Sequence, residues 1–355
     1  MLLLTGICGF VGSTLARAFK EHFENITIVG VDNLTRRGAF HNIAPLEKLG
    51  VKVIHGDLRC QSDVEALPDF DWLIDAAANP SVLAGADGKT SSRQLMEHNL
   101  LGTLNLLERC KQLNAGFILL STSRVYSIAP LASLPVKIVD NAYQPDENQP
   151  LPAGISRKGI AEPFSTTPPV SLYGISKLAS EALALEYSEA FRFPVWINRC
   201  GVLAGAGQFG RADQGIFSYW IHSHLRNRPL KYIGFDGEGH QVRDCLHPKD
   251  LVPLLLRQMQ ENDPTTTKPK LINVSGGIES ATSLRQLTQW CDARFEKRSI
   301  ASDPVPRPYD LPWVVLDSSL AQSAWDWHPT TTVDTILAEI AEHAEKNPDW
   351  LTISS

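Results

Sequence analysis

The chain has 355 residues, of which 43% are hydrophobic and 20% are charged, and its formal net charge at pH 7 is −6. This length suits one large domain or a core domain with a smaller lobe, and the composition is that of an ordinary globular protein. The acidic balance argues against nucleic acid or an anionic membrane surface as the main partner.

Cysteine usage and the apolar runs indicate a cytoplasmic protein. The 6 cysteines are scattered, with no Cys-x-x-Cys pair and no metal-ligand cluster with the 10 histidines. We therefore expect free thiols and no metal site. No apolar run reaches membrane-spanning length, and residues 1–4 lack the basic region and cleavage site of a signal peptide.

The N-terminus has the order strand, glycine-rich turn, helix. Residues 1–4 predict a buried strand, and residues 10–22 have apolar side chains at helical spacing. The turn over residues 5–12 reads TGICGFVG. In this order, the repeated glycines predict a turn that binds the diphosphate of a dinucleotide.

Each glycine of this turn has its own expected role. Gly6 allows the tight turn, Gly9 lets the backbone approach the diphosphate, and Gly12 lets the helix pack closely on the strand. The first helical turn, which includes Phe10 and Val11, then faces the negative charge with its backbone N–H groups.

A second apolar run, residues 26–31, ends in Asp32, twenty residues past the last of these glycines. A carboxylate there suits the free 2′- and 3′-hydroxyls of an adenosine ribose and repels a 2′-phosphate, so NAD is favoured over NADP. Asn33 belongs to the same predicted site. Arg36 and Arg37 lie close by, and they either soften this preference or are simply solvated.

Two further strands are expected to border the cofactor. Residues 51–55 form the third strand, and Asp57 and Leu58 follow it on the adenine side. On local grounds Asp57 is as well explained as the N-cap of a helix over residues 62–67. Residues 71–76 form the fourth strand.

Small residues after the fourth strand, including Ala76 and Ala77, leave room for a cofactor. A long amphipathic helix over residues 93–113 follows and contains Asn99. The fifth strand, residues 116–120, runs into Thr122, where open α/β sheets place their ligands. Thr122 is the best candidate to hold a reacting hydroxyl, with an ordinary turn residue as the alternative.

The segment over residues 127–169 is rich in Pro, Gly and polar residues and has no convincing periodicity. A connection of this length inside a compact domain is usually functional, such as a lid or an oligomer contact.

Tyr173 and Lys177 are four residues apart in a predicted helix that ends near residue 191, so they lie on one face. A phenol is a poor base near neutral pH, but a nearby ammonium stabilises the phenolate. The pair therefore fits a proton shuttle for a substrate hydroxyl. Alone it is weak evidence, because most such pairs are ordinary surface residues; the glycine turn in the same chain strengthens it.

The remaining elements complete a doubly wound parallel sheet with a smaller C-terminal α/β substrate-binding lobe. We expect the NAD-binding domain over residues 1–200, with a return crossing at about 241–275, and the lobe over 201–355. The expected elements are a sixth strand (194–199), a glycine-rich stretch (201–215), helices at 216–226, 248–260, 283–295 and 331–345, and a strand at 271–274.

Together these residues resemble the extended short-chain dehydrogenase/reductase superfamily, in its sugar-nucleotide epimerase/dehydratase branch, over nearly the whole chain. The resemblance implies NAD as the cofactor, a nucleotide-sugar substrate and a homo-oligomer, either a dimer or a tetramer. The NAD contacts it supports are Gly6, Gly9, Phe10, Val11, Gly12, Asp32, Asn33, Asp57, Leu58, Ala76, Ala77, Asn99, Tyr173 and Lys177. It assigns catalysis to Thr122, Tyr173 and Lys177, and substrate binding to Gln208, Phe209, Gln214, Arg243, Arg307 and Asp310.

The branch is narrowed by the residues after Thr122. A 4,6-dehydratase would carry Asp-Glu there, whereas Ser123 and Arg124 follow here. The run TSRVY resembles the TNKVY of CDP-paratose (CDP-tyvelose) 2-epimerases, as does GIAE at 159–162. The most specific matches are QFG at 208–210 with Asp213, Gln214 and Gly215, and QVRD at 241–244.

The resemblance thus implies a CDP-sugar 2-epimerase that oxidises its sugar transiently, lets it rotate and reduces it again. A UDP-hexose 4-epimerase or another sugar-nucleotide reaction is the alternative. A non-catalytic NAD-binding regulatory protein is disfavoured, because it needs no proton shuttle. Departures from the family pattern at 76–84, Ser127, Gly201 and Ala204 are expected to border the sugar pocket.

Overall fold

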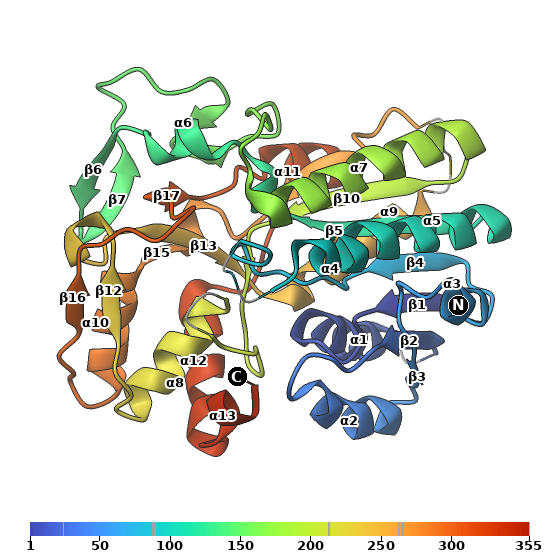
Figure 1. Cartoon of the computed structure of the whole chain (residues 1–355), viewed down its shortest axis with the longest axis horizontal. Coiled ribbons are helices and arrows are strands. Elements are labelled where there is room, and N and C mark those ends of the chain that lie inside the picture. The colour runs from blue at the N-terminus through green and yellow to red at the C-terminus, as the bar shows by residue number, and fades with distance from the viewer. Residues whose placement is uncertain are drawn as a thin grey trace.

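The computed structural model describes residues 1–23, 25–86, 88, 90–211, 214–261, 263 and 266–354. Its largest element is a seven-stranded, all-parallel sheet of order β14-β10-β5-β4-β1-β2-β3. The chain winds from β1, inside the sheet, outward to β3 on one side and to β14 on the other, which confirms the predicted doubly wound fold (Figure 1). The strands are β1 (Leu2–Thr5), β2 (Ile28–Asp32), β3 (Lys52–His55), β4 (Trp72–Asp75), β5 (Gly116–Thr122), β10 (Val195–Cys200) and β14 (Leu271–Val274).

Helices cover both faces of this sheet. One face carries α1 (Phe10–His22), α2 (Ile43–Lys48), α9 (Val252–Gln260) and α11 (Ser319–Trp325). The other carries α3 (Gln61–Glu65), α5 (Gly102–Leu113) and α7 (Ser171–Phe191).

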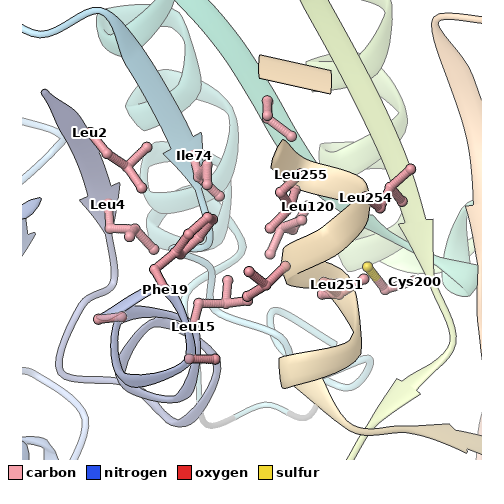
Figure 2. Close-up of a cluster of buried hydrophobic side chains, with 14 of the residues drawn as sticks. Leu2, Leu4, Leu15, Phe19, Ile74, Leu120, Cys200, Leu251, Leu254 and Leu255 are labelled. Atoms are coloured by element: carbon pink, nitrogen blue, oxygen red, sulfur yellow. The ribbon is translucent and has the colours of Figure 1, made fainter. Parts of the chain in front are cut away.

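The apolar run of β1 shows why both faces need cover. Side chains alternate along a strand, so Leu2 and Leu4 pack against Leu15 and Phe19 of α1 (Figure 2). Leu3 packs on the opposite face. Leu3 and Leu4 are fully buried, and each such leucine contributes about 1.5–3 kcal/mol of transfer free energy. A continuous apolar run is therefore the signature of a strand in the middle of this sheet.

The predicted helix over 93–113 is one continuous segment with a bulge. It consists of α4 (Ser92–Met96), a π-turn (Glu97–Leu101) and α5, and the Ser91 hydroxyl caps its start by accepting a hydrogen bond from the Gln94 amide. The π-turn contains Asn99, which is buried and faces α7.

The segment over 127–169 is more regular than its composition indicates. It holds a short helix, a two-stranded hairpin and a second small pair of strands, and it packs on the C-terminal lobe. The Tyr143 amide donates to the His240 carbonyl, and the Ile160 amide donates to the Val315 carbonyl, both at 2.8 Å. Its elements are α6 (Ile128–Ala132), β6 (Val136–Val139), β7 (Ala142–Pro145), β8 (Ile155–Ser156) and β9 (Gly159–Ile160).

The C-terminal lobe lies on the left of Figure 1 and has its own apolar core between helices and short strands. Its strands are β11 (Val202–Leu203), β13 (Val242–Leu246), β15 (Ala281–Ser283) and β17 (Trp313–Val314) in one sheet, and β12 (Lys231–Ile233) with β16 (Ala301–Asp303) in another. Its helices are α8 (Ile216–Leu225), α10 (Leu284–Arg294), α12 (Val333–Lys346) and α13 (Trp350–Ser354).

The lobe is not continuous in sequence. Residues 242–246 belong to the lobe sheet, and the chain then returns to the large sheet through α9 and β14. It returns a second time through α11, whose Trp325 packs edge-on against Trp196 of β10 at 4.8 Å between ring centroids. Among the described residues, no helix combines the length and apolarity needed to cross a bilayer.

Asp244 of the QVRD run connects β13 to the segments at residues 202, 275 and 316. Its buried carboxylate accepts hydrogen bonds from the Val202 amide, the Leu316 amide and the Ser275 hydroxyl. Burial raises the pKa of Asp244 to about 6, against the effect of these donors. Gly201 is required beside it, because a Cβ there would lie 2.6 Å from a carboxylate oxygen.

Two histidines pack against each other in the lobe core. His222 of α8 and His343 of α12 lie 5.6 Å apart between ring centroids, and neither His222 nitrogen has a hydrogen-bond partner among the described residues. Burial lowers the pKa of His222 to about 3 and that of His343 to about 4. Both rings are therefore neutral in the folded protein, whereas in the unfolded chain they titrate near pH 6.5.

We expect stability to fall as the pH drops below 6.5, because only the unfolded chain then gains these protons. The slope is about 1.4 kcal/mol per pH unit for each histidine that stays neutral. His222→Phe should remove the contribution of His222 to this slope. The free energy of unfolding, measured in urea at pH 7, 5.5 and 4.5, should therefore fall less with pH than in the wild type. The same change at exposed His328 serves as the control; parallel curves for wild type and His222→Phe would contradict this origin of acid sensitivity.

Candidate active site

The glycine turn lies between β1 and α1 at the carboxyl edge of the large sheet. Gly6 has φ +61°, and a Cβ on Gly12 would lie 2.3 Å from the Gly6 carbonyl oxygen, so both positions require glycine. Gly9 is the N-cap of α1, and no side chain caps the helix. The first-turn amides, which include Phe10 and Val11, are thus available for an anion, and the turn fits the diphosphate of NAD.

Asp32 at the end of β2 is held in its own turn. Its carboxylate accepts from the Cys8 amide at 2.9 Å and the Leu34 amide at 2.8 Å, and burial raises its pKa. Arg36 reaches across to the lobe, where it donates to the Gln214 side chain at 3.1 Å and to the Phe209 carbonyl at 3.4 Å. Arg36 therefore links the cofactor-side loop to the substrate side.

The Asp57 carboxylate accepts two hydrogen bonds from the Arg59 guanidinium, which lowers its pKa to about 2. It also lies 3.5 Å from the Asn33 amide nitrogen. The N-cap of α3 is Cys60, so the alternative of Asp57 as a helix cap is wrong. Adenine recognition by Asp57 and Leu58 stays a prediction.

The loop after β4 is fixed by hydrogen bonds. The Ala76 and Ala77 amides donate to the Thr5 hydroxyl at 3.1 Å, which keeps this loop against the glycine turn. The Asn99 side chain exchanges hydrogen bonds with the backbone of Asn79 and donates to the Ser176 hydroxyl at 3.0 Å. Its amide is thus occupied by protein groups, and it braces the loop against α7.

Tyr173 lies in the first turn of α7 and is 7% exposed. Burial raises its pKa to about 12, while a hydrogen bond with Thr122 and the charge of Arg124 act in the opposite direction. Thr122 ends β5 and also accepts from the Arg124 amide at 3.2 Å. The structure thus places a tyrosine and a threonine hydroxyl together at the carboxyl edge of the sheet.

Lys177 is one turn further along α7 and is 2% exposed. Burial lowers its pKa, while the charges of Asp75, Glu181 and Cys200 oppose this. None of the described carboxylates lies within ion-pair distance of its ammonium. That the Lys177 ammonium favours the phenolate form of Tyr173 stays a prediction.

A cavity of about 190 Å³ opens between the large sheet and the lobe. Four of the predicted substrate residues line it: Gln214, Arg243, Arg307 and Asp310. Arg243 donates to Asp310 at 2.8 Å and to the carbonyls of Val242 and Leu311. Arg243 of β13 and Arg307, from a segment distant in the sequence, thus both present positive charge to a phosphate group in the cavity.

Gln208 and Phe209 are placed elsewhere. Phe209 stacks on Trp350 and packs with Phe10, and the Gln208 carbonyl accepts from the Trp350 indole at 2.9 Å. Both residues contact Trp350 of α13, and neither lines the cavity. The Phe209 ring belongs to the small apolar core, whereas the Gln208 side-chain amide donates to the Leu203 carbonyl at 2.6 Å. Substrate binding by these two residues stays a prediction. Asp213 lies outside the described residues.

The positions at which this sequence departs from the family pattern fall into two groups, those that line the cavity and those that do not. Val82 and Leu83, within 76–84, line the cavity. Ser127 instead bonds Ser165 and the Thr167 carbonyl, and Gly201 and Ala204 lie in the packing of the lobe, so these three do not line the cavity. Their place at the border of the sugar stays a prediction.

Sequence reasoning missed three supporting residues. Asp75 and Glu181 supply the negative charge around Lys177, and Arg124 lines the cavity. Glu181 was accessible to reasoning, because it follows Lys177 by four residues on the same helix. The positions of Asp75 and Arg124 depend on how strands and lobe meet, which local patterns do not specify.

The fold and these residues define an NAD-binding enzyme of the Rossmann type, with a Thr/Tyr/Lys set beside an arginine-lined cavity. A model described as the NAD dependent epimerase/dehydratase family matches residues 2–275. The chain therefore belongs to that family, and NAD is its cofactor.

Relatives span the whole chain. CDP-paratose 2-epimerase of Salmonella typhi is 29% identical over 364 residues, covering 98% of each chain. A putative UDP-glucose 4-epimerase of Methanocaldococcus jannaschii is 25% identical over 332 residues, covering 93% of each.

Solved structures agree with the fold. MoeE5 in complex with UDP-glucose and NAD has a TM-score of 0.72 at 25% identity, covering 98% of this chain and 99% of that one. Pal from Bacillus thuringiensis has a TM-score of 0.77 at 23% identity, covering 97% of this chain and 99% of that one, and shows the shared fold.

Proposed function

We propose that this enzyme is a CDP-sugar 2-epimerase, in which residues 1–200 with α9 and β14 bind NAD, and the lobe, which includes β13 with Arg243, binds the sugar nucleotide. The observation that carries the proposal is the Thr122–Tyr173 pair beside a cavity lined by Arg243 and Arg307. The similarity to a CDP-paratose 2-epimerase along 98% of the chain supports the choice of nucleotide and carbon.

Bound NAD supplies the reversible oxidation of one sugar carbon. Tyr173, as phenolate, accepts the proton of the reacting hydroxyl and later returns it, and Thr122 shares that hydrogen bond. The Lys177 ammonium is available to a ribose hydroxyl of the cofactor. Arg243 and Arg307 hold the diphosphate, while the keto-sugar turns over in the cavity to present its other face.

Dehydration is disfavoured by the residues next to Thr122. Elimination of water from a sugar needs a paired acid and base close to the ring. Ser123 and Arg124 occupy these positions and include no carboxyl group. The cavity wall on this side carries a cation in place of a base.

The test is to incubate the purified enzyme with CDP- and UDP-hexoses in deuterated water and to follow the products by proton NMR. A C2 epimer from a CDP-sugar, without deuterium on carbon, is the expected result. Deuterium at C2 would indicate oxidation at a neighbouring carbon followed by proton exchange. A C4 epimer from a UDP-sugar would overturn the proposal in favour of a 4-epimerase.

A further inference from the structure

Arg36 crosses from the cofactor-binding half of the chain to the substrate-binding lobe. Its guanidinium donates to the Gln214 side-chain oxygen at 3.1 Å and to the Phe209 carbonyl at 3.4 Å. The guanidinium carbon also lies 5.5 Å from the centroid of the Phe209 ring. These three contacts join one side chain of the loop after β2 to the segment that precedes α8.

The loop that carries Arg36 is held by local hydrogen bonds. The Asp32 carboxylate accepts from the Leu34 amide at 2.8 Å. The Asn33 side-chain oxygen accepts from the Thr35 amide at 3.2 Å and from the Thr35 hydroxyl at 2.8 Å. Arg36 therefore reaches the lobe from a backbone whose position is fixed beside Asp32.

The segment that receives Arg36 forms part of the cavity wall. Gln214 and Gly215 both line the cavity. Gly215 is the N-cap of α8, and a Cβ there would lie 2.6 Å from the Phe209 carbonyl oxygen, which is the second acceptor of Arg36. Arg36 thus contacts the cavity wall directly, although it belongs to the other half of the molecule.

The chemistry of Arg36 decides which end of the Gln214 amide faces it. A guanidinium carries five N–H donors and no acceptor, whereas a primary amide has an oxygen acceptor at one end and an NH₂ donor at the other. The oxygen must therefore face Arg36, as observed. The amide nitrogen has no hydrogen-bond partner among the described residues, so it is available as a donor on the cavity wall.

We propose that Arg36 is a positioning residue for Gln214: it holds the amide oxygen, so that the amide nitrogen is presented as a donor to an oxygen of the sugar nucleotide. This inference rests on the proposed role of the cavity in binding that substrate. Without Arg36, the two ends of the amide have nearly the same shape, and either one can face the ligand. Binding then loses the contribution of a fixed donor, while NAD and the catalytic residues stay in place.

The first test measures the affinity of the NAD-loaded protein for CDP-glucose and for UDP-glucose by isothermal titration calorimetry. Arg36→Gln should weaken binding about 2- to 10-fold, which corresponds to the loss of one hydrogen bond. Gln214→Ala should weaken binding by a similar factor. In the Gln214→Ala background, Arg36→Gln should cause no further loss, because the side chain that Arg36 positions is already absent.

A second variant separates the orientation of the amide from the contact between the two halves of the molecule. Gln214→Glu keeps the contact, since a carboxylate accepts from the Arg36 guanidinium, but it removes the N–H donor. Binding should weaken at least as much as in Gln214→Ala, while the midpoint of thermal unfolding does not fall. Arg36→Lys retains a donor and should keep part of the affinity. Arg37→Gln, which changes the exposed neighbour of Arg36, is the control and should bind like the wild type.

Unchanged affinity in Arg36→Gln would overturn the proposal, as would a further loss of affinity when Arg36→Gln is added to Gln214→Ala. Normal binding by Gln214→Glu would also contradict it, since the N–H donor would then be unused. Loss of NAD from Arg36→Gln, measured after denaturation, would assign Arg36 to the cofactor instead. The expected pattern with UDP-glucose alone would uphold the proposal while removing the proposed CDP-sugar, whereas binding of neither sugar nucleotide would overturn both.

Discussion

Tyr173→Phe should abolish epimerisation while leaving NAD in place. The change removes one hydroxyl from a side chain that is 7% exposed, so the fold loses little packing. Loss of a positioned general base costs about 10²–10⁴ in rate. The diphosphate-binding turn of β1 and α1 does not involve this hydroxyl, so cofactor retention is expected to match that of the wild type.

Two measurements separate these effects: the turnover of a sugar nucleotide, and the amount of NAD released when the purified protein is denatured. Tyr187→Phe is the matched control, because it removes a hydroxyl from the same helix that donates to Glu108 at the surface. That variant should retain wild-type activity. Near-normal turnover by Tyr173→Phe would mean that another group moves the proton.

The cofactor half was predictable because its signals are local. Residues 10–22 were predicted as a helix and α1 has these bounds, and the strand predicted over 271–274 is β14. Continuous apolar runs, glycine turns and long amphipathic helices each occupy one stretch of sequence, so their patterns can be recognised without knowledge of the tertiary structure. Gly12 is one such signal, since the structure leaves no space for a side chain there.

The lobe was less predictable because its strands are two to five residues long and pair with distant segments. β13 pairs with β11, β15 and β17, so its partners lie on both sides of it in the sequence. Such short strands carry too few residues for a period to be recognised. The same reason explains why the hairpin within 127–169 was missed.

The candidate site shows a similar division. The sequence predicts which residues carry chemistry, such as Tyr173 and Lys177 one turn apart. It does not predict which groups surround them, because Asp75 comes from the end of β4 and Arg124 from the turn after β5. Phe209 shows that a residue within a motif can also pack in a small core, which its sequence context does not indicate.

Glu181→Ala should be the most destabilising of the single substitutions considered. Glu181 and Arg199 form a buried pair, 2% and 5% exposed, with Arg199 Nη2 2.6 Å from Glu181 Oε2 and a further hydrogen bond at 3.1 Å. The Ser121 hydroxyl also donates to Glu181. Removing the carboxylate leaves the buried guanidinium of Arg199, on β10, without its ion-pair partner. An unpaired buried charge of this kind costs about 3–5 kcal/mol of stability.

Urea unfolding of the NAD-loaded protein measures this cost. Glu189→Ala on the same helix breaks the exposed pair with Arg192 and should change the unfolding free energy by less than about 1 kcal/mol. The double variant Glu181→Leu/Arg199→Met should recover much of the loss, because an apolar pair of similar size leaves no unpaired charge. If Glu181→Ala were as stable as Glu189→Ala, the Glu181–Arg199 pair would not be a main support of α7.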